Sequence, residues 1–336
     1  MLVYPPQTAH KRHECGENID NFAETGYSLY MKQLLSVFCI ILFSAACPAL
    51  FASGILDSPV PRVSAPAEDG ASVWKISKDG NTLYLAGSVH VLRESDFPLP
   101  DEFEYAFSKS EILVLEADIG QVDNPEIMGY LLNRIFLPEG ETLKTLLDPE
   151  VFDLLSEKCR EYGMSINSVL RMKPSMVVNM LTVLQIQKLG FVQQGVDEYF
   201  FKKAKEENKP VYFLESVETQ IDMLLEMGEG YDSEYVLYSL QDMDEVEDEI
   251  DSLVYEWRYG ISGMTNGSLI ELKVNWPYLY RSMILDRHDI WLPQIRRFLA
   301  TGQVFFVVAG LAHMYGPDGL IWYLENSGCT VEKLRL

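Results

Sequence analysis

Basic side chains are in short supply in this chain of 336 residues. Lys and Arg number 27 against 50 Asp and Glu, which gives a formal net charge of −23 at pH 7 with neutral histidines. A surface this acidic repels the phosphate backbone of nucleic acids, so we expect no nucleic-acid partner. The same balance is compatible with a divalent cation or a cationic substrate, although acidic charge by itself mainly promotes solubility.

Cysteine is also scarce. Of the five cysteines, Cys15, Cys39 and Cys47 precede residue 53, and only Cys159 and Cys329 belong to the part that we expect to fold. No two cysteines have the Cys-x-x-Cys spacing, which excludes metal sites of that kind. Cys159 and Cys329 could form a disulfide in an oxidising compartment. Cys159 also fits the apolar face of a helix, so both interpretations stay open.

Several common catalytic motifs are missing as well. The sequence contains no G-x-S-x-G elbow, no H-E-x-x-H helix, no Walker loop and no dinucleotide fingerprint. The local signatures of serine α/β-hydrolases, helix-borne zinc peptidases, P-loop enzymes and Rossmann dehydrogenases are therefore absent.

The apolar run near the N-terminus is too short for a comfortable membrane span. Met31 and Lys32 precede this run, residues 34–43, and small residues up to Cys47 follow it. Basic, apolar and small residues in this order are typical of a secretory signal peptide. We therefore assign residues 31–52 to a signal peptide and expect an exported protein of the periplasm or cell envelope.

The cleavage point has two interpretations. Ser44-Ala45-Ala46-Cys47 is similar to a lipoprotein signal without its usual Leu, and a lipidated Cys47 would tether the protein to a membrane. Otherwise an ordinary cut falls near Ala52 or Gly54.

The remaining boundaries follow from composition. Residues 1–30 are polar and aperiodic, so we expect translation to begin at Met31; if they are real, the apolar run could act as an uncleaved anchor. Residues 53–71 are rich in Pro, Ala and Ser and are expected to form a linker. Residues 72–336 are then one folded domain.

Two distant segments share the pattern Gly-x-x-His. His90 ends Gly87-Ser88-Val89-His90, and His313 ends Gly310-Leu311-Ala312-His313. Each follows an apolar run typical of a buried strand, and each precedes a loop, a helical stretch and another strand-like run. Residues just beyond a strand lie where open α/β sheets bind ligands. If the two units pack as pseudo-symmetric halves, His90 and His313 lie at one site.

A single Gly-x-x-His pattern is weak, because a lone histidine near a strand is more often a hydrogen-bonded structural residue. The matched setting of the two copies favours a functional interpretation of the pair. Ser88 could be a nucleophile, but Leu311 occupies its place in the second unit, so we rank this role low.

The sequence between the two units is mainly helical. Residues 73–77 and 82–86 form a hairpin signal around Asp79-Gly80, and residues 142–300 keep mostly helical spacing. One strand-like run, 211–214, interrupts the helices. Alternating strands and helices of this kind predict an α/β fold.

Carboxylates close two strand-like runs. Glu116 follows residues 112–115, with Asp118 two positions further, and Glu215 follows residues 211–214. A carboxylate is costly to bury unless it is paired or binds a metal. A carboxylate that accepts loop amides is the structural alternative.

Arg287 lies near a helix end, between Asp286 and His288. It could form an exposed pair with Asp286, or its guanidinium could hold a carboxylate. Two histidines and a carboxylate are the common ligand set of hydrolytic metal sites, which leave positions for water and substrate.

Together these motifs resemble the TraB/GumN (PrgY-like) family, related to Tiki proteins and more distantly to erythromycin esterase and ChaN-like proteins. The resemblance spans about residues 72–335, and its specificity comes from the order and spacing of several short motifs. The motifs are Trp74-Lys75-Ile76, Leu85-Ala86-Gly87-Ser88-Val89-His90, Val114-Leu115-Glu116-Ala117-Asp118, Leu137-Pro138-Glu139-Gly140-Glu141-Thr142-Leu143, Gly195-Val196-Asp197, Phe213-Leu214-Glu215 with Gln220, and Val308-Ala309-Gly310-Leu311-Ala312-His313 with Gly316-Pro317-Asp318-Gly319-Leu320.

The resemblance implies a mixed central β-sheet flanked by helices, with the two β-GxxH-loop-α-β units meeting at its centre. It also implies that His90, Glu116 and His313 bind a divalent metal ion: manganese, cobalt or zinc. Tiki relatives are regarded as divalent-cation-dependent proteases, and TraB and PrgY relatives are linked to shutting down peptide pheromones. Family members usually have Arg-Asn where this chain has Arg287-His288, which leaves the local hydrogen bonding in doubt and could add a third imidazole.

We therefore predict an exported, metal-dependent hydrolase that acts on peptides or another small-molecule substrate. Glu215 is predicted as general base or as support for the ligands, and Arg287 as the holder of a substrate carboxylate or developing oxyanion. The alternative prediction is a non-enzymatic envelope protein that binds a peptide, haem or a metal, as ChaN-like relatives suggest.

Overall fold

The computed structural model describes residues 70–121, 123–191, 194–243 and 246–336. The predicted signal peptide, the lipidation point at Cys47 and nearly all of the predicted linker lie outside the described residues. Across the part of the chain that is described, no helix is both long and apolar enough to cross a membrane.

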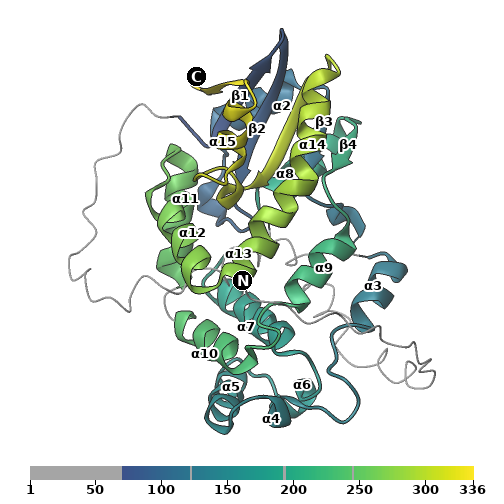
Figure 1. Ribbon diagram of the computed structural model, residues 1–336, viewed down its shortest axis with the longest axis vertical. Helices are drawn as coiled ribbons and strands as arrows, with labels where there is room; N and C mark the ends of the chain where they lie inside the picture. Colours follow the sequence, from purple (N-terminus) through teal and green to yellow (C-terminus); the bar gives the residue numbers. More distant parts are fainter. Residues whose placement is uncertain (1–69, 122, 192–193, 244–245) are drawn as a thin grey trace, which may run out of the picture.

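A six-stranded sheet forms one end of the described part (Figure 1). Its order is β4-β3-β5-β2-β1-β6, and β1 is antiparallel to both of its neighbours while the other pairs are parallel. The sheet is therefore mixed, as predicted. The strands are β1 (Val73–Lys78), β2 (Asn81–Ser88), β3 (Ile112–Leu115), β4 (Val211–Phe213), β5 (Phe305–Gly310) and β6 (Thr330–Lys333).

The predicted hairpin is confirmed. Strands β1 and β2 pair in an antiparallel register from Val73 opposite Ala86 to Lys78 opposite Asn81. Asp79 and Gly80 between them have φ of 50° and 83°. Two successive left-handed residues make the tight turn whose twist suits a hairpin.

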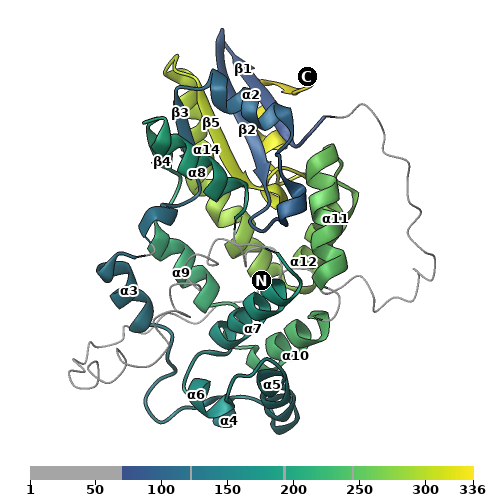
Figure 2. The same cartoon turned by 180° about the vertical axis from the view of Figure 1, so that it is seen from behind.

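Helices cover both faces of the sheet (Figures 1 and 2). Alternate residues of β5 show this directly, because successive side chains of a strand point to opposite faces. Phe306 packs on Phe107 and Phe200, which belong to α2 (Asp101–Lys109) and α8 (Val196–Glu206). Phe305 stacks on Phe298 of α14 (Asp286–Ala300), on the face that also carries α15 (Leu320–Asn326).

The insertion between β3 and β5 is mainly helical, as predicted. Apart from α8 and β4, which lie at the sheet, most of it extends toward the other end of the molecule (Figure 1). Helix α7 is buried on nearly every side, which explains why its sequence is apolar without a polar face. The helices of this part are α3 (Pro125–Leu132), α4 (Leu143–Leu146), α5 (Pro149–Glu161), α6 (Ile166–Val169), α7 (Pro174–Lys188), α9 (Val217–Leu225), α10 (Asp232–Asp242), α11 (Val246–Tyr259), α12 (Gly263–Asn275) and α13 (Pro277–Tyr280).

Strands β2 and β5 lie side by side and run in the same direction, with Ser88 opposite Gly310. Their carboxyl ends therefore meet at one edge of the sheet, and the loops that carry His90 and His313 start there. Each strand leads through a helix to another strand of the same direction: β2 through α2 to β3, and β5 through α15 to β6. Pseudo-symmetry between the two units beyond this shared order stays a prediction.

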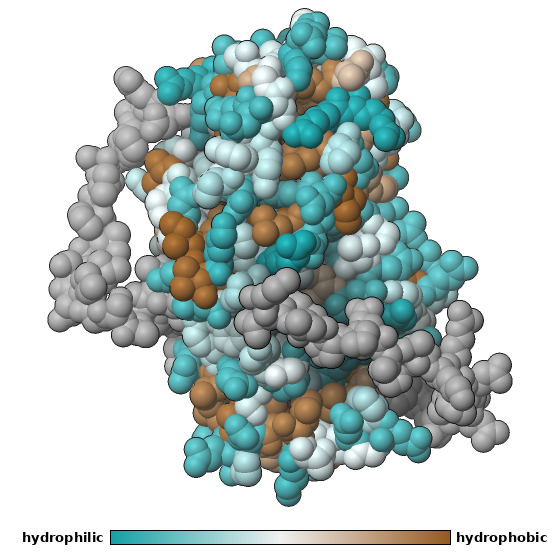
Figure 3. Space-filling model, in the orientation of Figure 1, coloured by the Kyte–Doolittle hydropathy of each residue, from teal (hydrophilic) through white to brown (hydrophobic). Residues whose placement is uncertain are grey.

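The two cysteines of the folded part are both buried and both free. Cys159 lies on the inner side of α5, as the helical interpretation expected. The face in Figure 3 is mostly hydrophilic with scattered apolar patches, in keeping with the acidic composition.

Candidate active site

A pocket of about 60 Å³ opens at the carboxyl ends of β2 and β5. Its polar end is lined by four residues that the sequence singled out: His90, Glu116, Arg287 and His313. Glu215 lies behind them, bonded to Arg287. The structure thus brings together all five predicted site residues, at the edge of the sheet where α/β proteins usually bind ligands. Asp118 is not part of the pocket and instead accepts a bond from the backbone N–H of Gly120.

His90 is held by a carboxylate. Its Nδ1 lies 2.7 Å from Oδ2 of Asp197, and both side chains are more than nine-tenths buried. Because a carboxylate only accepts hydrogen bonds, Nδ1 of His90 carries the proton and Nε2 presents a lone pair in the neutral form. The described residues offer no hydrogen-bond partner to this Nε2.

Asp197 reaches His90 because the start of α8 packs closely against the loop after β2. The backbone N–H of Val196 donates to the carbonyl of Val89 at 3.1 Å. A side chain at Gly195 would overlap the backbone of His90, so only glycine allows this approach. The first turn of α8 then places Asp197 beside the imidazole.

Arg287, in the first turn of α14, is buried between two carboxylates. Its Nη2 donates to Glu116 and, at 2.6 Å, to Glu215, while its Nε lies 3.1 and 3.2 Å from the two oxygens of Glu215. Its guanidinium also stacks over the ring of Trp291. This network is the buried form of the predicted guanidinium–carboxylate pairing.

Neutral donors satisfy the remaining oxygens of the two carboxylates. Glu116 accepts from the backbone N–H of Gly310 at 2.6 Å and from Gln220 at 3.2 Å. Glu215 accepts from Gln220 at 3.0 Å and from Trp291 Nε1 at 2.9 Å. Two buried carboxylates are tolerable here because every oxygen has a donor.

A chain of hydrogen bonds fixes the tautomers of the other two histidines. Nδ1 of His288 lies 2.8 Å from the carbonyl oxygen of Asp318, Nε2 of His288 lies 2.9 Å from Nδ1 of His313, and Nε2 of His313 lies 3.0 Å from Nη1 of Arg287. The carbonyl can only accept and the guanidinium can only donate. Each neutral ring therefore carries its proton on Nδ1, and the lone pair of His313 Nε2 faces Arg287.

The pKa values of the three histidines diverge for physical reasons. Burial disfavours the charged form of His90, but Asp197, its hydrogen bond and the charge of Glu116 outweigh burial and raise the pKa of His90. Burial lowers the pKa of His288 to about 4. Burial, with the charge of Arg287 next, holds the pKa of His313 well below its ordinary value. Glu116 and Glu215 raise the pKa of Arg287 despite its burial, so it stays charged.

An open position lies over the Cα of Gly310. A methyl group built there would lie 3.4 Å from Oε1 of Glu116, 3.5 Å from Nε2 of His90 and 3.6 Å from Cδ2 of His313. Three site residues thus surround one small space that the missing side chain keeps free. A water molecule or a substrate atom close to this space would touch all three.

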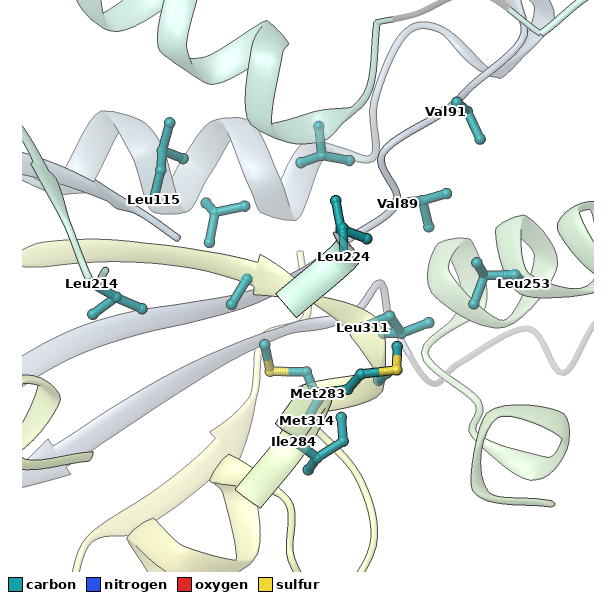
Figure 4. Close-up of a cluster of buried hydrophobic side chains, with 14 of the residues drawn as sticks. Val89, Val91, Leu115, Leu214, Leu224, Leu253, Met283, Ile284, Leu311 and Met314 are labelled. Atoms are coloured by element: carbon teal, nitrogen blue, oxygen red, sulfur yellow. The ribbon is translucent and has the colours of Figure 1, made fainter. Parts of the chain in front are cut away.

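Most of the remaining lining is apolar, as several side chains in Figure 4 illustrate, and Ser88, Glu249 and Ser268 are its polar members. Val89, Leu253, Met283 and Leu311 gather around it from the ends of β2 and β5, from α11 and from the π-helical turn η4 (Arg281–Leu285) before α14. Helix α12 adds Leu269 and Leu272.

Helices α11 and α12 are joined at the pocket by a buried carboxylate. Glu256 of α11 accepts from the backbone N–H groups of Met264 and Thr265, at 2.5 and 2.9 Å, and from the hydroxyl of Thr265. A carboxylate at a helix N-terminus is favoured by both hydrogen bonding and the helix dipole. It thereby fixes the apolar wall that α11 and α12 contribute to the pocket.

The predicted metal ligands do not fit a metal ion as they are arranged. Within the described ranges, no group of three or more His, Cys, Asp or Glu residues is placed to hold one. The reason is visible at Arg287, whose guanidinium takes up an oxygen of Glu116 and the Nε2 lone pair of His313. The positively charged guanidinium of Arg287 thus bonds to the atoms that a metal ion would need as ligands.

The sequence interpretation missed three partners in this network: Asp197, Gln220 and Trp291. Asp197 and Gln220 were within the family motifs, but a motif does not say which side chain each residue contacts. The sequence offers His288, which replaces the usual Asn of the family, as a third imidazole, and in the structure this ring bonds to His313. Trp291 gave no signal, because an aromatic residue at helical spacing is usually part of the core.

Comparison with known proteins agrees with this arrangement of motifs. Two curated relatives share 26% identity with this chain, and both carry the name "Uncharacterized protein YbaP". The relative from Escherichia coli (strain K12) aligns over 73% of this chain and 89% of its own length. The relative from Shigella flexneri aligns over 70% and 85%, respectively. No solved structure matches this chain.

The more distant relationships to Tiki and ChaN-like proteins stay predictions. The sequence pattern of the TraB/PrgY/gumN family matches residues 72–333, from the start of the sheet to its last strand. The chain therefore belongs to the TraB/PrgY/gumN family.

Proposed function

We propose that this protein is a hydrolase that cleaves carbonyl compounds, with peptides as the main class, by activating water at His90. The observation that carries the proposal is the buried His90–Asp197 pair at the polar end of an apolar pocket. A histidine backed by a carboxylate is a recurring general base in hydrolytic enzymes. Its neutral Nε2 is the atom available to take a proton.

The reaction balances with the groups present. Water over Gly310 gives a proton to Nε2 of His90 while its oxygen bonds to the carbonyl carbon. Asp197 stabilises the imidazolium that forms. His90 then returns the proton to the leaving amine or alcohol as the bond to the carbonyl carbon breaks, which releases a carboxylic acid. One residue thus serves first as base and then as acid.

Arg287 supplies positive charge for the oxyanion that develops. Four of its five N–H groups point at Glu116, Glu215 and His313, and the described residues give no partner to the second hydrogen on Nη1. Arg287 lines the pocket, and we assign this N–H to the substrate oxygen. A fixed cation in a site with little water stabilises such charge strongly. The sequence prediction also includes the stabilisation of a developing oxyanion by Arg287.

Glu215 is not a base in this scheme, because its oxygens are occupied by Arg287, Gln220 and Trp291. Glu215 keeps Arg287 in place. Of the two roles predicted for Glu215, general base or support, this is the supporting one. No step of this scheme uses a metal ion. If a divalent metal is required, as the resemblance implies, a chelator should abolish the activity.

The test is hydrolysis of a fluorogenic peptide library by the purified protein, before and after dialysis against a chelator. We expect cleavage of peptides with an apolar side chain beside the scissile bond, unchanged by the chelator. His90→Gln and Asp197→Asn should abolish or greatly slow cleavage, while Asp222→Asn, which alters a carboxylate that accepts from Tyr130 and is not part of the pocket lining, should not.

Three results would contradict parts of the proposal. Loss of activity on chelation, restored by manganese, cobalt or zinc, would favour the predicted metal-dependent mechanism. Full activity of His90→Gln would remove the proposed base. Peptide binding without any cleavage would favour the predicted non-enzymatic binder.

We also propose that the protein is exported by the N-terminal segment. The support is the order of basic, apolar and small residues at positions 31–52. Cell fractionation with mass determination of the mature N-terminus tests it. A lipid on Cys47 would indicate a membrane tether, a cut near Ala52 or Gly54 would indicate a free exported protein, and an intact N-terminus in the cytoplasm would contradict export.

A further inference from the structure

We propose that Ser88 is a substrate-binding residue whose hydroxyl donates a hydrogen bond to the carbonyl oxygen of the substrate, beside the water position over the Cα of Gly310. The inference rests on the proposed hydrolysis and names the place where the carbonyl group binds. The ligand class is therefore a carboxylic amide or ester.

The first observation is an unsatisfied hydroxyl. Ser88 is only 2% exposed, and its Oγ finds no hydrogen-bond partner in the described part of the chain. A buried hydroxyl without a partner destabilises a folded protein, so native structures seldom keep one without a use. Alanine would fill the same place at the end of β2 without this cost.

The second observation is where this hydroxyl lies. Ser88 lines the pocket, and it is opposite Gly310 in the parallel pairing of β2 and β5. Paired residues of neighbouring strands project to the same face of a sheet, about 5 Å apart. The Ser88 side chain and the open position over Gly310 are therefore neighbours on one face. A water placed there meets His90 and Glu116, and a carbonyl group that this water attacks lies on the side of Ser88.

The geometry favours binding over nucleophilic attack. An attacking serine needs a base within hydrogen-bond distance of its hydroxyl, and Ser88 Oγ has no such partner among the described residues. The base of this site, His90, is instead free at Nε2 to act on water. The low rank that the sequence gave to a nucleophilic Ser88 is consistent with this placement.

The main experiment compares Ser88→Ala with Ser175→Ala in hydrolysis and in urea unfolding. Ser175 is also buried, at 1% exposure, but its hydroxyl donates to the carbonyl of Leu225 at 2.9 Å, on α7 away from the pocket. We expect Ser88→Ala to lower kcat/KM by on the order of 100-fold, as loss of one donor to a developing oxyanion does, with an unchanged or higher unfolding midpoint. Ser175→Ala should show the opposite: normal kcat/KM and a lower midpoint.

A structural role would give a different pattern. If Ser88→Ala lowers the unfolding midpoint as Ser175→Ala does and leaves kcat/KM unchanged, the proposal is wrong. Comparing amide and ester substrates of the same side chain then shows whether the hydroxyl acts on both classes, since both present the same carbonyl oxygen.

A binding measurement separates failure of this inference from failure of the proposed function. The probe is N-acetyl-leucinal, whose hydrate has the two oxygens of a water adduct, and the control ligand is N-acetyl-isopentylamine, which lacks them. We expect calorimetry to show tighter binding of the aldehyde to the wild type, and this preference to fall about 10-fold in Ser88→Ala. Equal preference in both proteins would overturn the role of Ser88, even if no substrate is ever cleaved.

Gly310→Ala provides an independent variant. Its methyl group would lie at ordinary contact distance from Glu116, His90 and His313, so the fold should tolerate it. It should nevertheless remove the preference for the aldehyde, because it fills the space proposed for the water oxygen, which is one of the two oxygens of the hydrate. Retention of that preference in a folded Gly310→Ala protein would contradict the placement.

Discussion

His90 and His313 occupy the same position in two copies of one motif, and their surroundings give them opposite electrostatic character. His90 bonds to the carboxylate of Asp197, which favours its charged form. Burial favours the neutral form of His313 most strongly, and the permanent cation Arg287 and His288 on either side of the ring add to this effect. One histidine is therefore suited to exchange protons, and the other to remain a neutral acceptor.

The comparison shows that the motif determines where each histidine lies, while neighbouring side chains determine its charge state. Both histidines follow a glycine by three residues at the carboxyl end of a strand, so both reach the pocket. The partners come from elsewhere in the sequence: Asp197 from α8, and Arg287 and His288 from α14. Symmetry of the two motifs does not carry over to a symmetric site.

Arg287→Met should have the largest effect, because it removes the cation that makes the two sides different. Two buried carboxylates, Glu116 and Glu215, would lose their counter-charge, and the free energy of unfolding should fall by about 3–5 kcal/mol. Urea denaturation measures the loss. Arg287→Lys should recover part of it, because a single ammonium group cannot bond at once to both carboxylates and His313. Equal stability of wild type and Arg287→Met would contradict the buried network.

Asp197→Asn should have the next largest effect. The amide can no longer stabilise an imidazolium on His90, so kcat/KM should fall by on the order of 10³-fold while the fold is kept. The assay is hydrolysis of the best library peptide, with circular dichroism as the check on folding. A rate within a factor of two of the wild type would show that the carboxylate does not assist the base.

The pH dependence of kcat/KM tests the protonation behaviour assigned to His90. Only neutral His90 accepts a proton, and Asp197 raises its pKa, so kcat/KM of the wild type should increase with pH through a value above the ordinary 6.5. In Asp197→Asn the pKa loses this support, and the acid limb of the profile should move to lower pH. An acid limb that stays in place, or moves upward, would rule out His90 as the group that titrates.

His288→Leu should have the smallest effect on the fold and a selective effect at acid pH. Burial lowers the pKa of His288 to about 4, so the unfolded chain binds a proton more readily than the folded chain. Stability from this group is complete above pH 6.5 and declines as the pH falls towards 4. Urea midpoints between pH 4 and 7 should therefore depend less on pH in His288→Leu than in the wild type. An unaltered pH dependence would contradict a neutral, buried His288.

Much of the fold could be predicted because its signals are local. The Asp79-Gly80 turn, the Ser216 cap of α9, whose hydroxyl accepts from Thr219, and the apolar runs of β2 and β5 each depend on a few neighbouring residues. The meeting of His90 with His313 was also predictable, because carboxyl ends of adjacent parallel strands share an edge.

The hydrogen-bond network of the site could not be predicted in the same way. Whether Glu116 faces a metal or Arg287 depends on the course of α14, which lies 171 positions further along the chain. The bond from His288 to His313 depends on how α14 packs against the loop after β5. Such choices are set by tertiary packing, and residue types alone allow several of them.

The most direct test of the contrast is nuclear magnetic resonance of the imidazole nitrogens in metal-free wild type, assigned with His90→Gln and His313→Gln and followed from pH 5 to 9. We expect His90 to titrate above 6.5 with its proton on Nδ1 when neutral, and His313 to stay neutral throughout with its proton on Nδ1. Titration of both rings at the same pH, or a charged His313 beside a neutral His90, would contradict the account.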